Sequence, residues 1–155
     1  MSGQNSGKRH IVLTPMRNEA DFIEKCAKSI VEQTILPEEW IIIDDSSDDS
    51  GSEKIANIAK EHSWIKVLKT EITGKRGRGE RIARLINIGL EQVTVEWDFC
   101  SKIDADIILP KRYFEEIFSR FHQNNTLGIA SGGCYVDGLL GLTLEKVSEG
   151  HTRGA

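Results

Sequence analysis

The 155-residue sequence lacks any apolar run approaching the roughly 20 residues that a membrane-spanning helix requires. It also lacks an apolar stretch behind its first lysine, so residues 1–8 fit a short disordered lead and not a secretory signal. These two absences predict a cytoplasmic location. In a longer protein, that location would include the cytoplasmic face of a membrane.

Cysteine is scarce, with three residues far apart in the chain: Cys26, Cys100 and Cys134. An odd number at such spacings suits neither a disulfide framework nor a Cys-x-x-Cys metal site. We therefore expect three plain, buried thiols.

An excess of positive charge is also missing, because 20 Lys and Arg residues stand against 24 Asp and Glu residues, for a net charge of −4. Binding to nucleic acid depends on Lys and Arg that neutralise phosphates. We therefore expect no nucleic-acid partner. The one basic cluster, residues 75–84, needs a local explanation.

What the sequence does contain is an alternation of strand-length apolar runs with segments of helical periodicity. This alternation is typical of βαβ units and predicts a three-layer α/β/α fold with a mostly parallel central sheet. The expected strands are residues 9–14, 40–43, 64–69, 97–103 and 127–136. The expected helices are residues 19–33, about 53–62, 81–93 and 111–121, with Pro110 opening the last of them.

Two carboxylates, Asp104 and Asp106, follow the predicted strand 97–103. At positions i and i+2 they can approach one point when the chain turns, and a hard cation bound to phosphate oxygens favours such ligands. The pattern predicts Mn²⁺ or Mg²⁺ at Asp104 and Asp106. Acidic residues after strands are also common in solvated turns, so the pattern alone leaves that alternative open.

A second acidic pair, Asp44 and Asp45, follows the predicted strand 40–43. Ligands of open α/β sheets bind outside the carboxyl ends of the strands, so both acidic pairs are expected at one edge. We expect Asp45 to face the ligand and accept a hydrogen bond from a base N–H or a ribose hydroxyl. Residues after Ser46 are expected to cap the following helix.

The basic loop of residues 75–81 is rich in Arg and Gly. Its charges could offset those of a diphosphate, and its glycines allow close approach of the backbone. Arg81 is the first choice for the residue that turns inward, and Lys75 is the second. A solvated basic face is the alternative.

Three segments together, TPMRNEADFIEKCAKSIVEQT, WIIIDDSSDDS and KIDADIILP, resemble family 2 glycosyltransferases of the GT-A fold. The resemblance spans roughly residues 9–136 and keeps the motifs in the family's order. It implies transfer of a sugar, with inversion and metal dependence, from a UDP- or GDP-linked donor to an acceptor that the sequence does not identify.

The resemblance also implies roles for single residues. Thr14, Pro15 and Glu19 match the loop around the base and ribose, and Asp45 matches the carboxylate that holds the base.

On the phosphate side, Asp104 and Asp106 match the DxD motif that meets ribose and metal. Arg81 or Lys75 occupies the region where the family often carries a basic residue near the diphosphate.

The family's general base, an Asp or Glu from a later segment, has no clear match among Asp137, Glu145 and Glu149. Residues 137–155 are therefore expected to begin an acceptor-side segment that is cut short. We expect the chain to be the amino-terminal part of a longer enzyme, inactive alone and able to self-associate through uncovered apolar surface.

Three other classes of protein compete with this interpretation. A non-catalytic fragment that binds nucleotide sugars is the main alternative. A receiver-type signalling domain fits poorly, because its acidic pair follows the first strand and it needs a late Lys. A nucleotidyltransferase normally has a glycine-rich loop after the first strand, whereas residues 14–19 contain no glycine.

Overall fold

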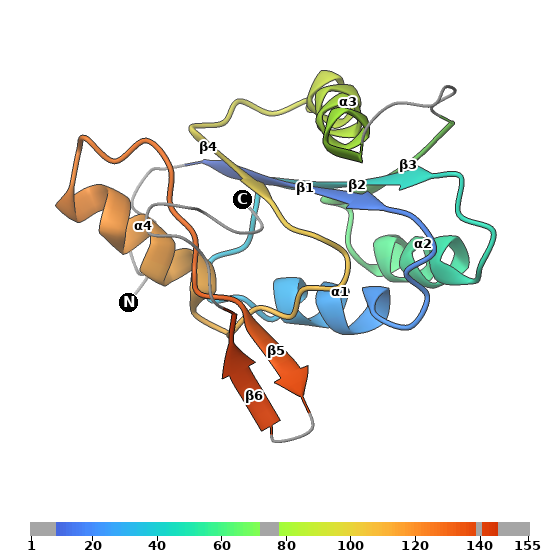
Figure 1. Ribbon diagram of the computed structural model, residues 1–155. Coiled ribbons are helices and arrows are strands. Elements are labelled where there is room, and N and C mark those ends of the chain that lie inside the picture. Colours follow the sequence, from blue (N-terminus) through green and yellow to red (C-terminus); the bar gives the residue numbers. More distant parts are fainter. Residues whose placement is uncertain (1–8, 72–77, 139–140, 146–155) are drawn as a thin grey trace.

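The computed structural model describes residues 9–71, 78–138 and 141–145, so the predicted lead at residues 1–8 lies outside the described residues. Four strands form one parallel sheet in the order β3-β2-β1-β4, with helices on both faces (Figure 1). A two-stranded antiparallel hairpin, β5-β6, stands apart from it. The predicted α/β/α layering around a parallel sheet is confirmed.

The elements match the predicted ones up to the fourth helix, with ends displaced by a few residues. In chain order they are β1 His10–Met16, α1 Ile23–Val31, β2 Glu39–Asp45, α2 Gly51–Glu61, β3 Ile65–Thr70, α3 Arg78–Glu91, β4 Phe99–Lys102, α4 Tyr113–Gln123, β5 Tyr135–Gly138 and β6 Gly141–Leu144.

The sheet has one buried apolar cluster on each face. Successive side chains along a strand point to opposite faces and therefore join different clusters. On β1 and β2, even-numbered residues such as Val12, Trp40 and Ile42 pack toward α1, α2 and α4, whereas odd-numbered residues such as Leu13 and Ile41 pack toward α3. Figure 1 shows α3 alone above the sheet, with α1 and α2 below it. This alternation also decides which side of the sheet each polar residue at the strand ends faces.

Pro15 lies inside β1, although the predicted strand ended one residue earlier, at residue 14. The carbonyl oxygen of Leu13 accepts the N–H of Ile103 on the β4 side. Pro15 is two residues further on and faces the same side, where β4 has already ended at Lys102. The missing N–H of Pro15 therefore costs no ladder hydrogen bond, and β1 continues to Met16.

The strand predicted at residues 127–136 is wrong. Residues 127–134 have no regular secondary structure, and Tyr135 begins the separate hairpin. Glycines interrupt this stretch and weaken a strand. At Gly132 the backbone comes so close to Tyr113 of α4 that an added Cβ would lie 2.9 Å from the ring, and the Gly132 N–H donates to the Tyr113 hydroxyl at 3.3 Å.

Large apolar side chains are exposed around this region: Trp97, Ile129, Tyr135, Val136, Leu142 and Leu144. A cleft of about 560 Å³ runs between β4, α4 and residues 124–130. Self-association through this surface stays a prediction. Cys26 is buried as predicted, whereas Cys100, on β4, is exposed and Cys134 is partly exposed. No described helix has the length and apolar character needed to cross a membrane.

His10 predicts a measurable loss of stability in acid. Its ring is 2% exposed against Phe114 and Phe118, and neither ring nitrogen has a hydrogen-bond partner. Burial lowers the pKa of His10 from 6.5 to about 4. Between these values the unfolded chain binds more protons, so the free energy of unfolding should fall as pH drops from 6.5 to 4, by up to about 3 kcal/mol.

Urea unfolding between pH 7.5 and 4 measures this loss. His10→Leu should flatten the part of the profile between pH 6.5 and 4, while His122→Leu, at an exposed site on α4, should leave it as in the parent. An unchanged profile in His10→Leu would contradict the assignment.

Candidate functional site

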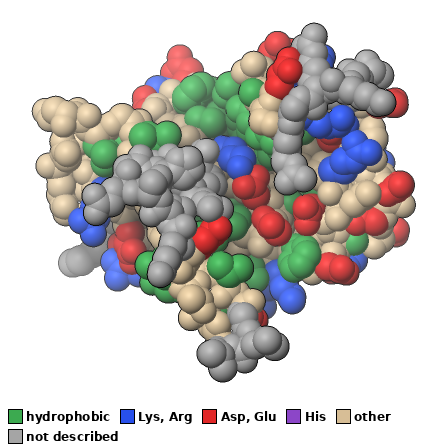
Figure 2. Space-filling model, viewed as in Figure 1, with side chains coloured by type: hydrophobic (Ala, Val, Ile, Leu, Met, Phe, Trp, Pro, Cys, Tyr) green, Lys and Arg blue, Asp and Glu red, His purple; other side chains and the backbone are tan. Residues whose placement is uncertain are grey.

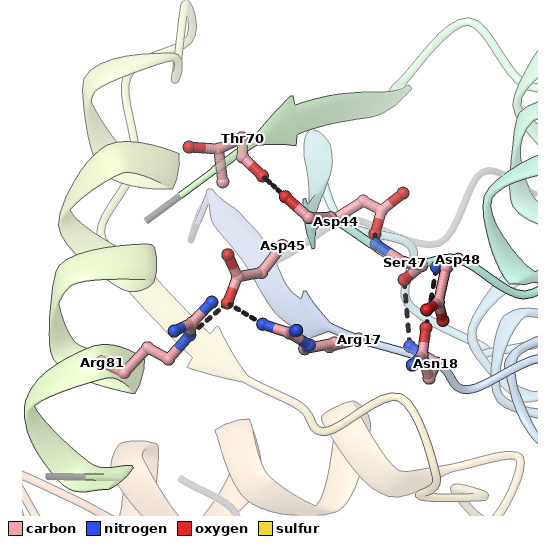
Figure 3. A network of polar contacts seen from close by, with 9 residues as sticks. Arg17, Asn18, Asp44, Asp45, Ser47, Asp48, Thr70 and Arg81 are labelled. Carbon is pink, nitrogen blue, oxygen red and sulfur yellow. Dashed lines mark hydrogen bonds and ion pairs between the residues drawn. The ribbon is translucent and has the colours of Figure 1, made fainter. Parts of the chain in front are cut away.

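The loops after the first three strands are tied together at the carboxyl edge of the sheet (Figure 3). The Asn18 N–H donates to Ser47 Oγ at 3.0 Å, and Asn18 Oδ1 accepts the N–H of Asp48 at 2.9 Å. Ser46 Oγ donates to the carbonyl of Thr70 at 3.1 Å. Because all three strands run parallel, their ends meet here, and these bonds fix the loops relative to one another.

Two residues of these loops have left-handed backbones, Asn18 with φ 56° and Ser46 with φ 55°. Asn adopts this conformation readily, whereas Ser does so at a cost. Non-glycine residues held in this region cluster at functional sites when the surrounding contacts enforce them. The hydrogen bonds of both side chains supply that enforcement.

Asp44 and Asp45 are both 1% exposed, yet they face opposite sides of the sheet. Asp44 accepts the N–H of Ser47 at 3.0 Å and the hydroxyl of Ser52, the second residue of α2. Asp44 is thus occupied with holding the loop and the start of α2. Asp45 is on the α3 side, where Arg81 lies.

Asp45 holds two guanidinium groups (Figure 3). Arg81 Nε donates to Asp45 Oδ2, and Arg17 Nη1 lies 3.9 Å from the same oxygen. The hydrogen bond to Asp45 raises the pKa of Arg81 above its ordinary value. Each guanidinium carries five donors, so both keep donors that can meet an anion. The three groups together carry a net positive charge on the α3 side.

Glu19, Asp104 and Asp106 bring negative charge from the loops after β1 and β4. Burial, and then the charges of Asp106, Asp49 and Asp104, raise the pKa of Glu19. Asp49 is already engaged, accepting the N–H groups of Ala20 at 2.8 Å and Gly51 at 2.9 Å. The carboxylates of Glu19, Asp104 and Asp106 therefore repel one another, and a bound cation would relieve this repulsion.

The two residues of the DxD motif differ in their surroundings. Asp104 Oδ2 accepts a hydrogen bond from Lys102 Nζ at 2.6 Å, and the Asp104 carbonyl accepts the N–H of Ile107 at 3.1 Å, which closes a turn. Asp106 is exposed within that turn. On the face shown in Figure 2, acidic and basic side chains adjoin near the centre.

The carboxylates of Asp104 and Asp106 suit a hard cation that takes its remaining ligands from phosphate and water. The described residues contain no group of three His, Cys, Asp or Glu side chains placed to hold a metal. Mg²⁺ and Mn²⁺ bound to phosphates commonly take only one or two carboxylates from the protein, with phosphate and water oxygens completing the shell. Asp104 and Asp106 could supply that share.

The other predicted residues are placed differently. Thr14 is fully buried and its hydroxyl accepts the indole N–H of Trp40 at 2.9 Å, so its side chain serves the core. Pro15 is also buried. Lys75 lies outside the described residues.

Arg17 and Lys102 were missed by the sequence analysis. Lys102 carries a sequence signal, because it precedes Asp104 by two residues at the end of a predicted strand. Arg17 directly follows β1, but its place beside Asp45 depends on the strand order, which the sequence alone does not give.

Residues 11–141 match the family model for glycosyl transferase family 2. The chain is 27% identical over 127 residues to EpsJ, an uncharacterized glycosyltransferase of Bacillus subtilis (strain 168), which covers 80% of this chain and 33% of the relative. It is 29% identical over 115 residues to the poly-beta-1,6-N-acetyl-D-glucosamine synthase of Staphylococcus aureus (strain MW2), covering 74% of this chain and 26% of that protein.

Two solved structures resemble the fold. The mannosyltransferase PcManGT from Pyrobaculum calidifontis, in complex with GDP-Man and Mn²⁺, has a TM-score of 0.61 at 25% identity, covering 80% of this chain and 35% of that one. S. aureus TarS 1–349 with UDP-GlcNAc has a TM-score of 0.59 at 21% identity, covering 76% and 32%, which supports the fold alone. The chain spans about a third or less of these relatives' length.

Proposed function

The chain belongs to glycosyl transferase family 2, and from this premise we propose that its sheet edge binds a nucleoside-diphosphate sugar together with a divalent cation. The observation that carries the proposal is the meeting of two charge groups at one edge. Asp45 with Arg17 and Arg81 forms one group, and Glu19, Asp104 and Asp106 form the other.

Within this proposal, the nucleoside lies on the β1–β2 side of the edge. The Asp45 carboxylate accepts a hydrogen bond from the base or ribose, and Arg81 shares its donors between Asp45 and the diphosphate. Thr14 and Pro15 are buried within β1, so they support this side of the edge from inside the sheet. Glu19 borders the ribose.

On the β4 side, Asp104 and Asp106 hold Mn²⁺ or Mg²⁺ by their carboxylate oxygens. When bound, the cation supplies positive charge to the leaving diphosphate. The mannosyltransferase with GDP-Man and Mn²⁺, at 25% identity, supports both a divalent cation and a nucleoside-diphosphate donor. The nucleobase and the sugar are left open between UDP- and GDP-linked donors.

The reaction proposed for the whole enzyme is an inverting displacement. A carboxylate outside residues 9–136 takes the proton of the acceptor hydroxyl, whose oxygen attacks the anomeric carbon. The bond from that carbon to the diphosphate breaks, and the nucleoside diphosphate leaves with the electron pair. Arg81 stabilises the charge that develops on it.

A thermal-shift series with UDP, GDP, ADP and CDP, each with and without Mn²⁺, tests donor binding. At 100 times Kd, binding stabilises the folded state by about 2.7 kcal/mol. In a chain of this length that corresponds to a rise in Tm of about 5–10 °C. We expect this rise for UDP or GDP, and only with Mn²⁺ at full size. No rise with any nucleotide would overturn the proposal.

Sugar transfer separates this enzyme function from its alternative, a fragment that binds nucleotide sugars without catalysis. We expect residues 1–155 to bind the nucleotide yet transfer sugar on the order of 100- to 10,000-fold more slowly than a chain that supplies a positioned base. Release of UDP or GDP from the donor in the presence of acceptor measures this. Rapid transfer by residues 1–155 would show that the base lies within them.

A further inference from the structure

The ammonium group of Lys102 places a positive charge within the candidate metal site. Lys102 is the last residue of β4, and Asp104 follows two residues later in the loop after this strand. The Lys102 ammonium nitrogen lies 2.6 Å from Asp104 Oδ2. The side chains are 21% and 39% exposed, so water screens this pair only in part.

The ammonium and a metal would compete for the same oxygen. A divalent cation binds carboxylate oxygen at about 2.0–2.2 Å, which would place it within about 5 Å of the Lys102 nitrogen. Two like charges at that distance in a half-buried site repel each other strongly. Metal binding to Asp104 therefore requires the Lys102 ammonium to move away from Oδ2.

The neighbouring charges show where Lys102 could go. Arg17 and Arg81 are both gathered around Asp45, so Lys102 is the cation that the described structure places on Asp104. A diphosphate brought to this edge would offer Lys102 a new anionic partner. Metal without diphosphate brings no such partner.

We propose that the Lys102 ammonium is the counter-ion of Asp104 in the free protein. It moves from Asp104 to the diphosphate when metal and nucleotide bind together. This rests on the proposed function and adds a consequence to it. Metal alone binds weakly because it must expel the ammonium, and metal and nucleotide each strengthen the binding of the other. By linkage this coupling factor is the same for both ligands. Lys102 is thus a positioning residue that couples the binding of the metal to that of the nucleotide.

Titration of Mn²⁺, followed by the EPR signal of the free ion with and without GDP or UDP, tests this in the parent chain and in Lys102→Met. The variant keeps an unbranched stem but loses the charge. We expect Mn²⁺ alone to bind about fivefold more tightly or better, and the coupling between Mn²⁺ and nucleotide to fall by a similar factor. Lys111→Met, at an exposed site before α4, should behave as the parent.

Lys102→Arg provides the rescue, because it keeps the positive charge and should restore weak Mn²⁺ binding and strong coupling. Equal or weaker Mn²⁺ affinity in Lys102→Met, with coupling unchanged, would overturn the role of Lys102 while leaving the metal site in place. Absence of any coupling between Mn²⁺ and nucleotide in the parent chain would overturn the proposed function as well. Tm values of all variants confirm that each is folded.

Discussion

Asp106→Ala is expected to abolish the Mn²⁺ dependence of nucleoside-diphosphate binding. Asp106 is exposed in the turn after β4, so its removal deletes a charged oxygen ligand without disturbing the core. Loss of a contact that merely supports a metal ligand typically costs 10- to 100-fold, so loss of a ligand itself should cost at least about 100-fold in the Mn²⁺-dependent part of the affinity. Isothermal titration with UDP or GDP, with and without Mn²⁺, measures that part.

Asp48→Ala is the matched control for this variant. Asp48 is also exposed, carries the same charge and lies at the same edge of the sheet, where its backbone N–H and not its carboxylate bonds to Asn18. A general loss of negative charge would affect both variants equally. The metal assignment predicts a loss in Asp106→Ala alone, and Mn²⁺-dependent binding that survived in Asp106→Ala would disprove it.

The side of the sheet that each site residue faces could be predicted from the sequence. Alternation along β2 places Asp44 with Trp40 and Ile42, and Asp45 with Ile41 and Ile43. The sequence also predicted every strand of the parallel sheet, and β2 most clearly, because a strand covered on both faces reads as a continuous apolar run such as Trp40 to Ile43. The edge at which the acidic pairs meet follows from those strands alone.

The pairing of charges could not be predicted in the same way. Which cation reaches which carboxylate depends on the strand order, and this order places β1 between β2 and β4. Arg81 was expected at the diphosphate, and the structure pairs it with Asp45. The strand predicted at residues 127–136 failed for a different reason, since close contact between Gly132 and Tyr113 outweighs the weak strand tendency of a glycine-rich run.

Asp45→Asn should weaken nucleoside binding by about tenfold or more even without metal, and Asp44→Asn should not. The two residues are adjacent, equally buried and both hydrogen-bonded, but only Asp45 faces Arg17 and Arg81. Both variants lose a charged acceptor and should lose about 1–3 kcal/mol of stability, which urea unfolding measures.

Affinity separates these two variants. Asn keeps the shape of Asp45 but replaces the charged acceptor, and it leaves Arg81 and Arg17 without a counter-charge. Titration with uridine and guanosine, which carry no phosphate, is done without metal. It measures the nucleoside contact separately from the metal and diphosphate contacts on the β4 side of the edge. If both variants bound nucleoside as the parent does, Asp45 would be an anchor for the two arginines only. Equal weakening in both would mean that binding depends on an ordered loop after β2, and not on the Asp45 carboxylate itself.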